Sequence, residues 1–187
     1  MRADYRSVRR RRRAAGLTLI ELMVALSVLA ALLVIGLPSF TEVILGNRLT
    51  SFANSFVSAI QLGRSEAIKR NAQVKLCVAN AGGTGCTNGG WQQGWILFRD
   101  ADDDDTVDSD EEVVLRQTAL GGGFSLTDTN VTPVSQLIFR SGGEIDVSRD
   151  FRLCRASPSP GGQERTIRIM ATGRVSGVVT TKNGTCP

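Results

Sequence analysis

The stretch LTLIELMVALSVLAALLVIGL, residues 17–37, contains 21 residues with one charged side chain, Glu21. As a helix it rises about 31 Å, which is the hydrocarbon thickness of a bilayer. Seven arginines and one acid, Asp4, precede it in residues 1–16. Because basic residues favour the cytoplasmic side, we expect a single-pass inner-membrane helix with a cytoplasmic N-terminus and an extracytoplasmic remainder.

Beyond Pro38 apolar residues recur every three or four positions as far as about Arg70, which predicts an amphipathic helix with one apolar stripe. The stripe consists of Leu45, Leu49, Phe52, Phe56, Ile60, Gly63 and Ala67. We interpret residues 17–70 as one long helix, with 17–37 in lipid and 38–70 offering the stripe to a sheet. Two helices with a break are the alternative, because proline removes a helical hydrogen bond.

Residues 71–187, which we call the head, change to a period of two. Eight short apolar or alternating runs, separated by Gly, Asn, Asp and Pro clusters, predict a β-rich domain. The predicted strands are 74–79, 95–98, 113–116, 124–127, 137–140, 151–155, 166–171 and 175–180. The expected fold class is therefore α+β, a lollipop in which a long N-terminal helix packs against a β-rich head.

The charge is unevenly distributed. The formal net charge is +4, but residues 1–16 contribute +6, so the rest of the chain carries about −2. The net positive charge of the full sequence therefore does not indicate that the whole chain binds nucleic acid. Residues 71–139 carry three basic and ten acidic side chains, whereas 140–187 carry eight basic and four acidic ones. The sequence also lacks histidine, a nucleophile motif and a phosphate-binding loop, so we expect no enzyme.

Four cysteines lie in the head, and an exported domain meets oxidising conditions, which favours disulfides. They are Cys77, Cys86, Cys154 and Cys186. Zinc is disfavoured because the chain has no histidine and no Cys-x-x-Cys pair. Of the three pairings we favour Cys77 with Cys86 and Cys154 with Cys186, which join close neighbours, although the sequence leaves the connectivity open.

The sequence GLTLIE, residues 16–21, resembles a type IV prepilin cleavage site, with Gly16 ending the leader and Leu17 becoming the new N-terminus. Pro38 then falls where pilin helices commonly bend. The resemblance implies that a prepilin peptidase/methyltransferase removes residues 1–16 and methylates Leu17. It also implies that Glu21 pairs with a neighbouring subunit's new amino terminus during filament assembly. The alternative for Glu21 is a first-turn acid favoured by the helix dipole.

The segment Cys77-x8-Cys86, followed by Trp91, Trp95 and the run ILFRD, is similar to the globular domain of the GspH/FimT family of minor pseudopilins and minor pilins. This resemblance implies a subunit of a type II secretion or type IV pilus filament, with other pseudopilins or pilins as partners and no chemistry of its own. For Trp91 and Trp95 themselves we expect core packing.

Residues 100–111 place oxygens at positions 1, 3, 5, 9 and 12 of a twelve-residue calcium loop. The candidate ligands are Asp100, Asp102, Asp104, Asp108 and Glu111. Asp105 stands at the sixth position, where such loops turn on glycine, and the flanks predict strands rather than helices. We therefore favour a solvated acidic hairpin and no cofactor, with weak calcium binding as the alternative.

The C-terminal region is rich in cations that could hold DNA phosphates. The candidates are Arg165, Arg168, Arg174 and Lys182. Some FimT-like minor pilins bind DNA in natural transformation, and their Gly-Arg step resembles Gly173-Arg174. Ser176 stands where their second arginine is expected, and no aromatic residue follows Phe151. A filament subunit is thus the first hypothesis, and a DNA-uptake minor pilin is the second.

Overall fold

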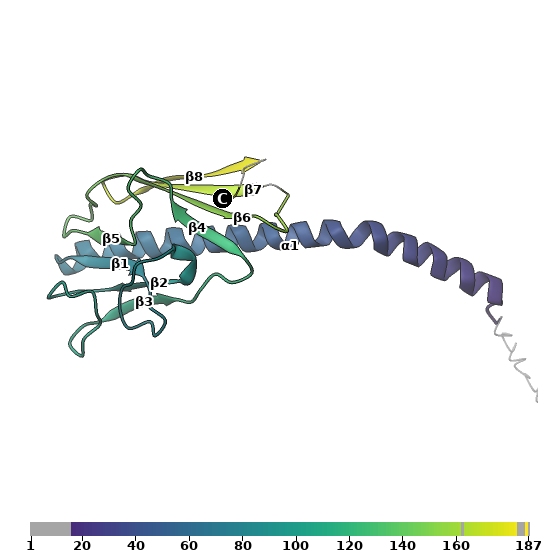
Figure 1. Ribbon diagram of the computed structural model, residues 1–187, viewed down its shortest axis with the longest axis horizontal. Helices are drawn as coiled ribbons and strands as arrows, with labels where there is room; N and C mark the ends of the chain where they lie inside the picture. The colour runs from purple at the N-terminus through teal and green to yellow at the C-terminus, as the bar shows by residue number, and fades with distance from the viewer. Residues whose placement is uncertain (1–15, 162, 183–185, 187) are drawn as a thin grey trace, which may run out of the picture. The chain divides into compact units, whose positions relative to one another are not determined.

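The computed structural model describes residues 16–161, 163–182 and 186, without the side chains of 34–39 and of Lys182. It forms two units, Met1–Ser39 and Phe40–Pro187. The described chain contains one long α-helix, one 3-10 turn and eight strands, which confirms the α+β class (Figure 1).

Helix α1, Leu19–Arg70, runs without a break for 52 residues, which confirms the single-helix prediction. It begins two residues after the predicted start because Thr18 caps it. The carbonyl of Thr18 accepts the N–H of Leu22 at 3.1 Å, and its hydroxyl accepts the N–H of Glu21 at 3.3 Å. The pattern Thr18-x-x-Glu21 is that of a capping box, in which the cap satisfies an N–H that the helix leaves free.

The other end of α1 closes at Asn71, which has a left-handed φ of 48°. The N–H of Asn71 bonds the carbonyl of Ile68, and the N–H of Ala72 bonds that of Ala67, both at 3.2 Å. This pair of bonds is the Schellman motif, for which asparagine is the usual substitute for glycine.

The first unit contains the predicted membrane span. Among the residues that the structure describes, none belongs to a helix with both the length and the apolarity of a membrane span. The last four residues of the predicted span 17–37, and Pro38 after it, fall where side chains are not described. Of the predicted leader 1–16, only Gly16 lies within the described residues.

The head contains two four-stranded antiparallel sheets, in the orders β3-β2-β1-β5 and β4-β6-β7-β8. The elements are β1 Val74–Val78, η1 Trp91–Gln93, β2 Trp95–Phe98, β3 Val113–Gln117, β4 Phe124–Asp128, β5 Gln136–Phe139, β6 Arg149–Arg155, β7 Gln163–Ile169 and β8 Val175–Lys182. All eight predicted strands are present, and β6 and β7 begin two and three residues earlier than predicted. Figure 1 shows β6 to β8 on one side of α1 and β2 and β3 on the other.

The core of the second unit surrounds Phe56 of α1. Its ring meets those of Trp91, Trp95 and Phe151 edge to face, with centroids 5.3, 5.1 and 5.0 Å away. Both tryptophans are buried, which confirms the expectation of core packing. Because Trp95 belongs to one sheet and Phe151 to the other, the apolar stripe of α1 joins the two sheets into one core.

At Gly63 helix α1 lies close to the first sheet. A methyl group added there would lie 2.7 Å from the ring of Phe139 and 3.0 Å from Leu97. On the other side of the stripe, Phe52 meets Phe124 of β4 edge to face at 5.1 Å. The stripe therefore needs a small residue at one position and aromatic ones at others.

Both favoured disulfides are present, Cys77–Cys86 and Cys154–Cys186. The first ties β1 to the loop that follows it. The second ties β6 to residue 186, beyond the end of β8.

Candidate functional site

The predicted processing junction, Gly16 and Leu17, precedes helix α1. Gly16 and Leu17 are exposed and lie outside regular secondary structure, with Leu17 76% accessible. A peptidase needs an extended, accessible backbone, and the cap at Thr18 keeps the helix from starting earlier. Glu21 lies in the first turn of α1 with its side chain exposed.

The helix after this junction exposes apolar side chains on every face. They are Leu19, Ile20, Leu22, Met23, Val24, Leu26, Val28, Leu29, Leu32 and Leu33, each 50–76% exposed. Because consecutive helical residues point about 100° apart, runs such as 22–24 leave no polar face. A helix that is apolar all round is typical of a segment that lipid or other helices surround.

The acidic loop 100–111 folds around a lysine that sequence reasoning missed. Lys75, in the middle of β1, is 1% exposed, and its Nζ lies 2.6 Å from Asp100, 2.8 Å from Asp103 and 2.5 Å from Asp105. Burial alone lowers the pKa of Lys75, but the three carboxylates outweigh it and raise that pKa. The signal in the sequence is a lysine inside the otherwise apolar strand VKLCV.

The predicted calcium ligands are only partly brought together. Carboxylate oxygens of Asp100, Asp102 and Asp104 lie within 4.8 Å of one another. Asp108 and Glu111 are not part of that group within the described loop. Glu111 instead accepts the backbone N–H groups of Ala101 at 2.6 Å and of Asp108 at 3.3 Å, so it closes the loop.

The four candidate DNA contacts do not share one surface. Arg165 and Arg168 are three residues apart on β7 and so point to opposite faces of the sheet. Arg165 donates to Thr50 of α1 at 3.2 Å. Arg174 and Lys182 lie near opposite ends of β8, about 26 Å apart along an extended strand.

Arg168 is neutralised where it lies. Its Nε and Nη2 donate to the two carboxylate oxygens of Asp150 at 2.8 and 2.7 Å. This bidentate bond holds the pKa of Asp150 below and that of Arg168 above its ordinary value. A guanidinium paired in this way has less to offer a phosphate.

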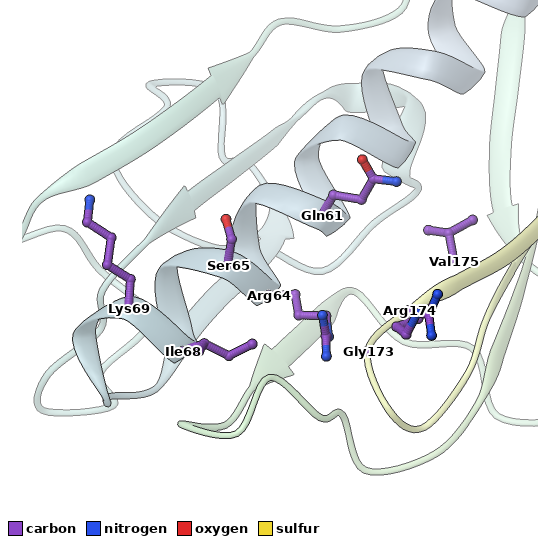
Figure 2. Close-up of a pocket in the computed structure, with 8 residues that line it drawn as sticks. All are labelled: Gln61, Arg64, Ser65, Ile68, Lys69, Gly173, Arg174 and Val175. Atoms are coloured by element: carbon purple, nitrogen blue, oxygen red, sulfur yellow. The ribbon is translucent and has the colours of Figure 1, made fainter.

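Arg174 instead faces a groove of 410 Å³ between the end of α1 and the turn before β8 (Figure 2). The groove is lined by Gln61, Arg64, Ser65, Ile68, Lys69, Gly173, Arg174 and Val175. Three of these side chains are cationic, and the two from α1, Arg64 and Lys69, were not predicted. Helical spacing could not have grouped them, because residues five apart do not share a helix face, and the turn with Arg174 lies more than a hundred residues later.

Gly173 makes this groove possible. It has a φ of 73°, and a methyl group there would lie 1.8 Å from the carbonyl oxygen of Gly143. The backbone therefore turns in left-handed geometry against another backbone, which only glycine permits. Arg64 fixes the turn to α1 by donating to the carbonyl of Thr172 at 3.1 Å.

Comparisons with solved structures find pilin-like folds. The chain is similar to the type IV minor pilin FimU of Pseudomonas aeruginosa strain PAO1, at 17% identity and a TM-score of 0.54 over 70% of this chain and 87% of FimU. It also matches the minor pseudopilin EpsH from the type 2 secretion system of Vibrio cholerae, at 17% identity and a TM-score of 0.48, over 73% and 98%. At such identities the likeness to FimU concerns the fold alone. No curated protein matches the sequence.

Family models decide the relationship. The model for the type II transport protein GspH matches residues 53–173, and the model for the prokaryotic N-terminal methylation motif matches residues 11–37. The two matches cover well over half of the chain, and both agree with the resemblance in its sequence. The chain therefore belongs to the GspH family of type II transport proteins, as a pilin-like protein with an N-terminal methylation motif.

Proposed function

We propose that this chain is a minor subunit of a type II secretion or type IV pilus filament, cleaved after Gly16 by a prepilin peptidase and methylated on Leu17. Before assembly, residues 17–37 hold it in the inner membrane with the head in the periplasm. The observation that carries the proposal is the all-round exposure of apolar side chains over residues 19–33, within the matched methylation motif of residues 11–37.

The physical argument is one of burial. Each large apolar side chain gains about 1.5–3 kcal/mol when it leaves water, so ten half-exposed ones favour lipid or neighbouring helices strongly. Filament growth can then exchange lipid contacts for contacts with other subunits at small net cost. The family comprises structural subunits, and the work of this chain is accordingly mechanical.

In this proposal Glu21 sets the axial register between neighbouring subunits. A carboxylate in apolar surroundings is costly unless a cation meets it, and cleavage after Gly16 creates an ammonium group on Leu17 of every subunit. Pairing between Glu21 of one subunit and that ammonium of the next satisfies both charges. It also favours one axial offset between neighbouring helices.

The test has two readouts. The full chain is expressed with the prepilin peptidase and with an inactive peptidase, and its N-terminus is identified by mass spectrometry. We expect a start at Leu17 with one added methyl group, only with the active enzyme. A different start, or none, would contradict the processing step.

The second readout is incorporation into sheared filaments. Glu21→Gln should be cleaved normally but be lost from the filament fraction. Glu42→Gln, on an exposed position of the same helix, is the matched control and should incorporate as the native chain does. Equal incorporation of both variants would overturn the pairing of Glu21.

DNA capture is a second candidate function, favoured by the groove that Arg174 and Arg64 line; Lys69 also lines it but pairs with Glu66 at 3.4 Å. Phosphate contacts release counterions, so binding should weaken steeply with salt, and each lost contact should reduce the salt slope by about 1. We expect Arg174→Ala to reduce the salt slope. Arg116 is an exposed arginine of the other sheet, and Arg116→Ala should leave the slope unchanged. No binding at low salt would dismiss this candidate.

A further inference from the structure

The acidic loop 100–111 already contains a cation. The Nζ atom of Lys75 lies within 2.5–2.8 Å of Asp100, Asp103 and Asp105. The side chain of Asp100 is fully buried beside it, while Asp103 and Asp105 are 70% and 49% exposed. The three carboxylates thus come from the loop, and the positive charge comes from a strand 25 residues earlier in the chain.

The loop has the geometry of a chain wrapped around an ion. Asp100 accepts the backbone N–H groups of Asp103 at 2.7 Å and of Asp105 at 3.1 Å. Asp103 and Asp105 both adopt left-handed φ values, 64° and 65°. Asp105 occupies the sixth position, so it makes the sharp turn for which a calcium loop uses glycine.

Other contacts hold the loop independently of Lys75. The N–H of Cys86 bonds the carbonyl of Asp105 at 2.8 Å, and the N–H of Val107 bonds that of Thr84 at 2.9 Å. The disulfide Cys77–Cys86 ties Cys86, which contacts the acidic loop, to β1, the strand that carries the lysine. The carboxylates are therefore positioned by backbone on one side and by Glu111 on the other.

We propose that the ammonium group of Lys75 is the resident cation of loop 100–111, held by the carboxylates of Asp100, Asp103 and Asp105. The native head consequently closes this loop without metal. Replacing Lys75 by an uncharged residue opens a site for a calcium-sized ion between Asp100, Asp103 and Asp105.

The two cations exclude each other for reasons of distance and charge. Calcium binds oxygens at 2.3–2.6 Å and needs six to eight of them, so it would have to stand where the ammonium now stands. A divalent ion beside a buried ammonium group would also be repelled. Without the lysine, the buried carboxylate of Asp100 is left uncompensated beside two further carboxylates, which is destabilising until another cation arrives.

The test uses the full chain in detergent, with thermal unfolding followed in EDTA and in millimolar calcium, and with terbium luminescence as a direct binding readout. Lys75→Met keeps the length and apolar stem of the side chain. Lys69→Met, on an exposed position of α1, is the matched control. Lys75→Arg keeps a cation in the loop.

For the native chain, Lys69→Met and Lys75→Arg, we expect the melting temperature of each protein to be the same in EDTA and in calcium. None of the three should give a saturable terbium signal. In EDTA, Lys75→Met should melt roughly 10 °C lower, and calcium should restore at least half of that loss. Adding Asp103→Asn to Lys75→Met should abolish the restoration and the terbium signal.

Three results would overturn the proposal. The first is a calcium-dependent rise in the melting temperature of the native chain that Asp103→Asn removes, because the loop would then hold metal beside the lysine. The second is a folded Lys75→Met that binds no terbium. The third is a Lys75→Met that stays unfolded with calcium present, since metal could not then replace the ammonium group.

Discussion

The two stretches of helix α1 differ in what surrounds their large apolar side chains. Over residues 19–33 the large apolar side chains are 50–76% exposed, whereas Leu49, Phe56 and Ile60 are fully buried. The backbone hydrogen bonds are the same in both. Helix continuity is therefore a local property, while burial depends on a partner. The second stretch finds its partner in its own sheets, and the first requires lipid or other subunits.

The sharpest way to break this comparison is to truncate Phe56. Phe56→Ala removes a ring that contacts three other buried rings, so we expect a loss of about 3–5 kcal/mol in the free energy of unfolding. Phe40→Ala is the matched control on the same helix, because Phe40 is 71% exposed. Urea unfolding of the full chain in detergent measures both. Similar losses would show that the two positions are equally buried.

Two glycines of α1 provide a smaller contrast with opposite signs. Gly46 has open space where a methyl group would go, so Gly46→Ala should stabilise the protein by about 0.5–1 kcal/mol. At Gly63 the same methyl group meets the buried ring of Phe139, and we expect Gly63→Ala to cost about 1–3 kcal/mol despite its better helix propensity. Thermal unfolding of both variants tests the sign. A stabilising Gly63→Ala would mean that the sheet can move away.

The buried stretch should also respond to acid at its C-terminal end. Glu66 accepts from Arg70 at 2.7 Å, and this bond holds the pKa of Glu66 below its ordinary value. The unfolded chain therefore binds the proton first. The contribution of Glu66 is complete at neutral pH and is lost as the pH falls below about 4.

This predicts a stability gap between the native chain and Glu66→Gln at pH 7 that closes near pH 3, smaller than the effect at Gly63. Melting temperatures across a pH series measure it, with Glu42→Gln as the exposed control. A gap that grows toward acid would contradict the assigned direction of the pKa shift.

The smallest expected effect is at Leu29, which is 52% exposed in the first unit. Leu29→Ala should change the unfolding free energy of the head by less than about 0.5 kcal/mol, because it removes no buried contact there. Its effect should appear instead as reduced incorporation into filaments. A large loss of head stability would show that the first stretch is packed against the head.

Most of the fold could be predicted because its signals are local. The stripe on α1 and the eight strands follow from periodicity and turn residues. Cysteine spacing favoured the disulfide pairing that the structure has, without fixing it. The start of α1 was placed two residues early because the cap at Thr18 was overlooked. The N-terminal motif is likewise a local pattern, so GLTLIE was enough to predict a processing junction.

The candidate sites were predicted less well, since they depend on which side chains meet. Arg165 and Arg168 were grouped by their nearness in sequence, but alternation along β7 sends them to opposite faces. Arg168 is occupied by Asp150, which belongs to the neighbouring strand β6. Arg174 lies apart from the other three candidates, in a groove that Arg64 and Lys69 line from helix α1.

Composition and periodicity alone were sufficient for the long helix, the apolar N-terminal stretch and the β-rich head, because hydrogen bonding and burial patterns repeat over a few residues. Strand pairing, in contrast, decided which charged side chains lie next to each other. Antiparallel pairing of β1 with β2 brings Lys75 opposite Phe98, just before the acidic loop begins, and so sets its ammonium group among Asp100, Asp103 and Asp105. No local sequence pattern encodes the contact of Lys75 with these aspartates. Residues far apart in the chain come within range of Coulomb attraction only when the chain has folded.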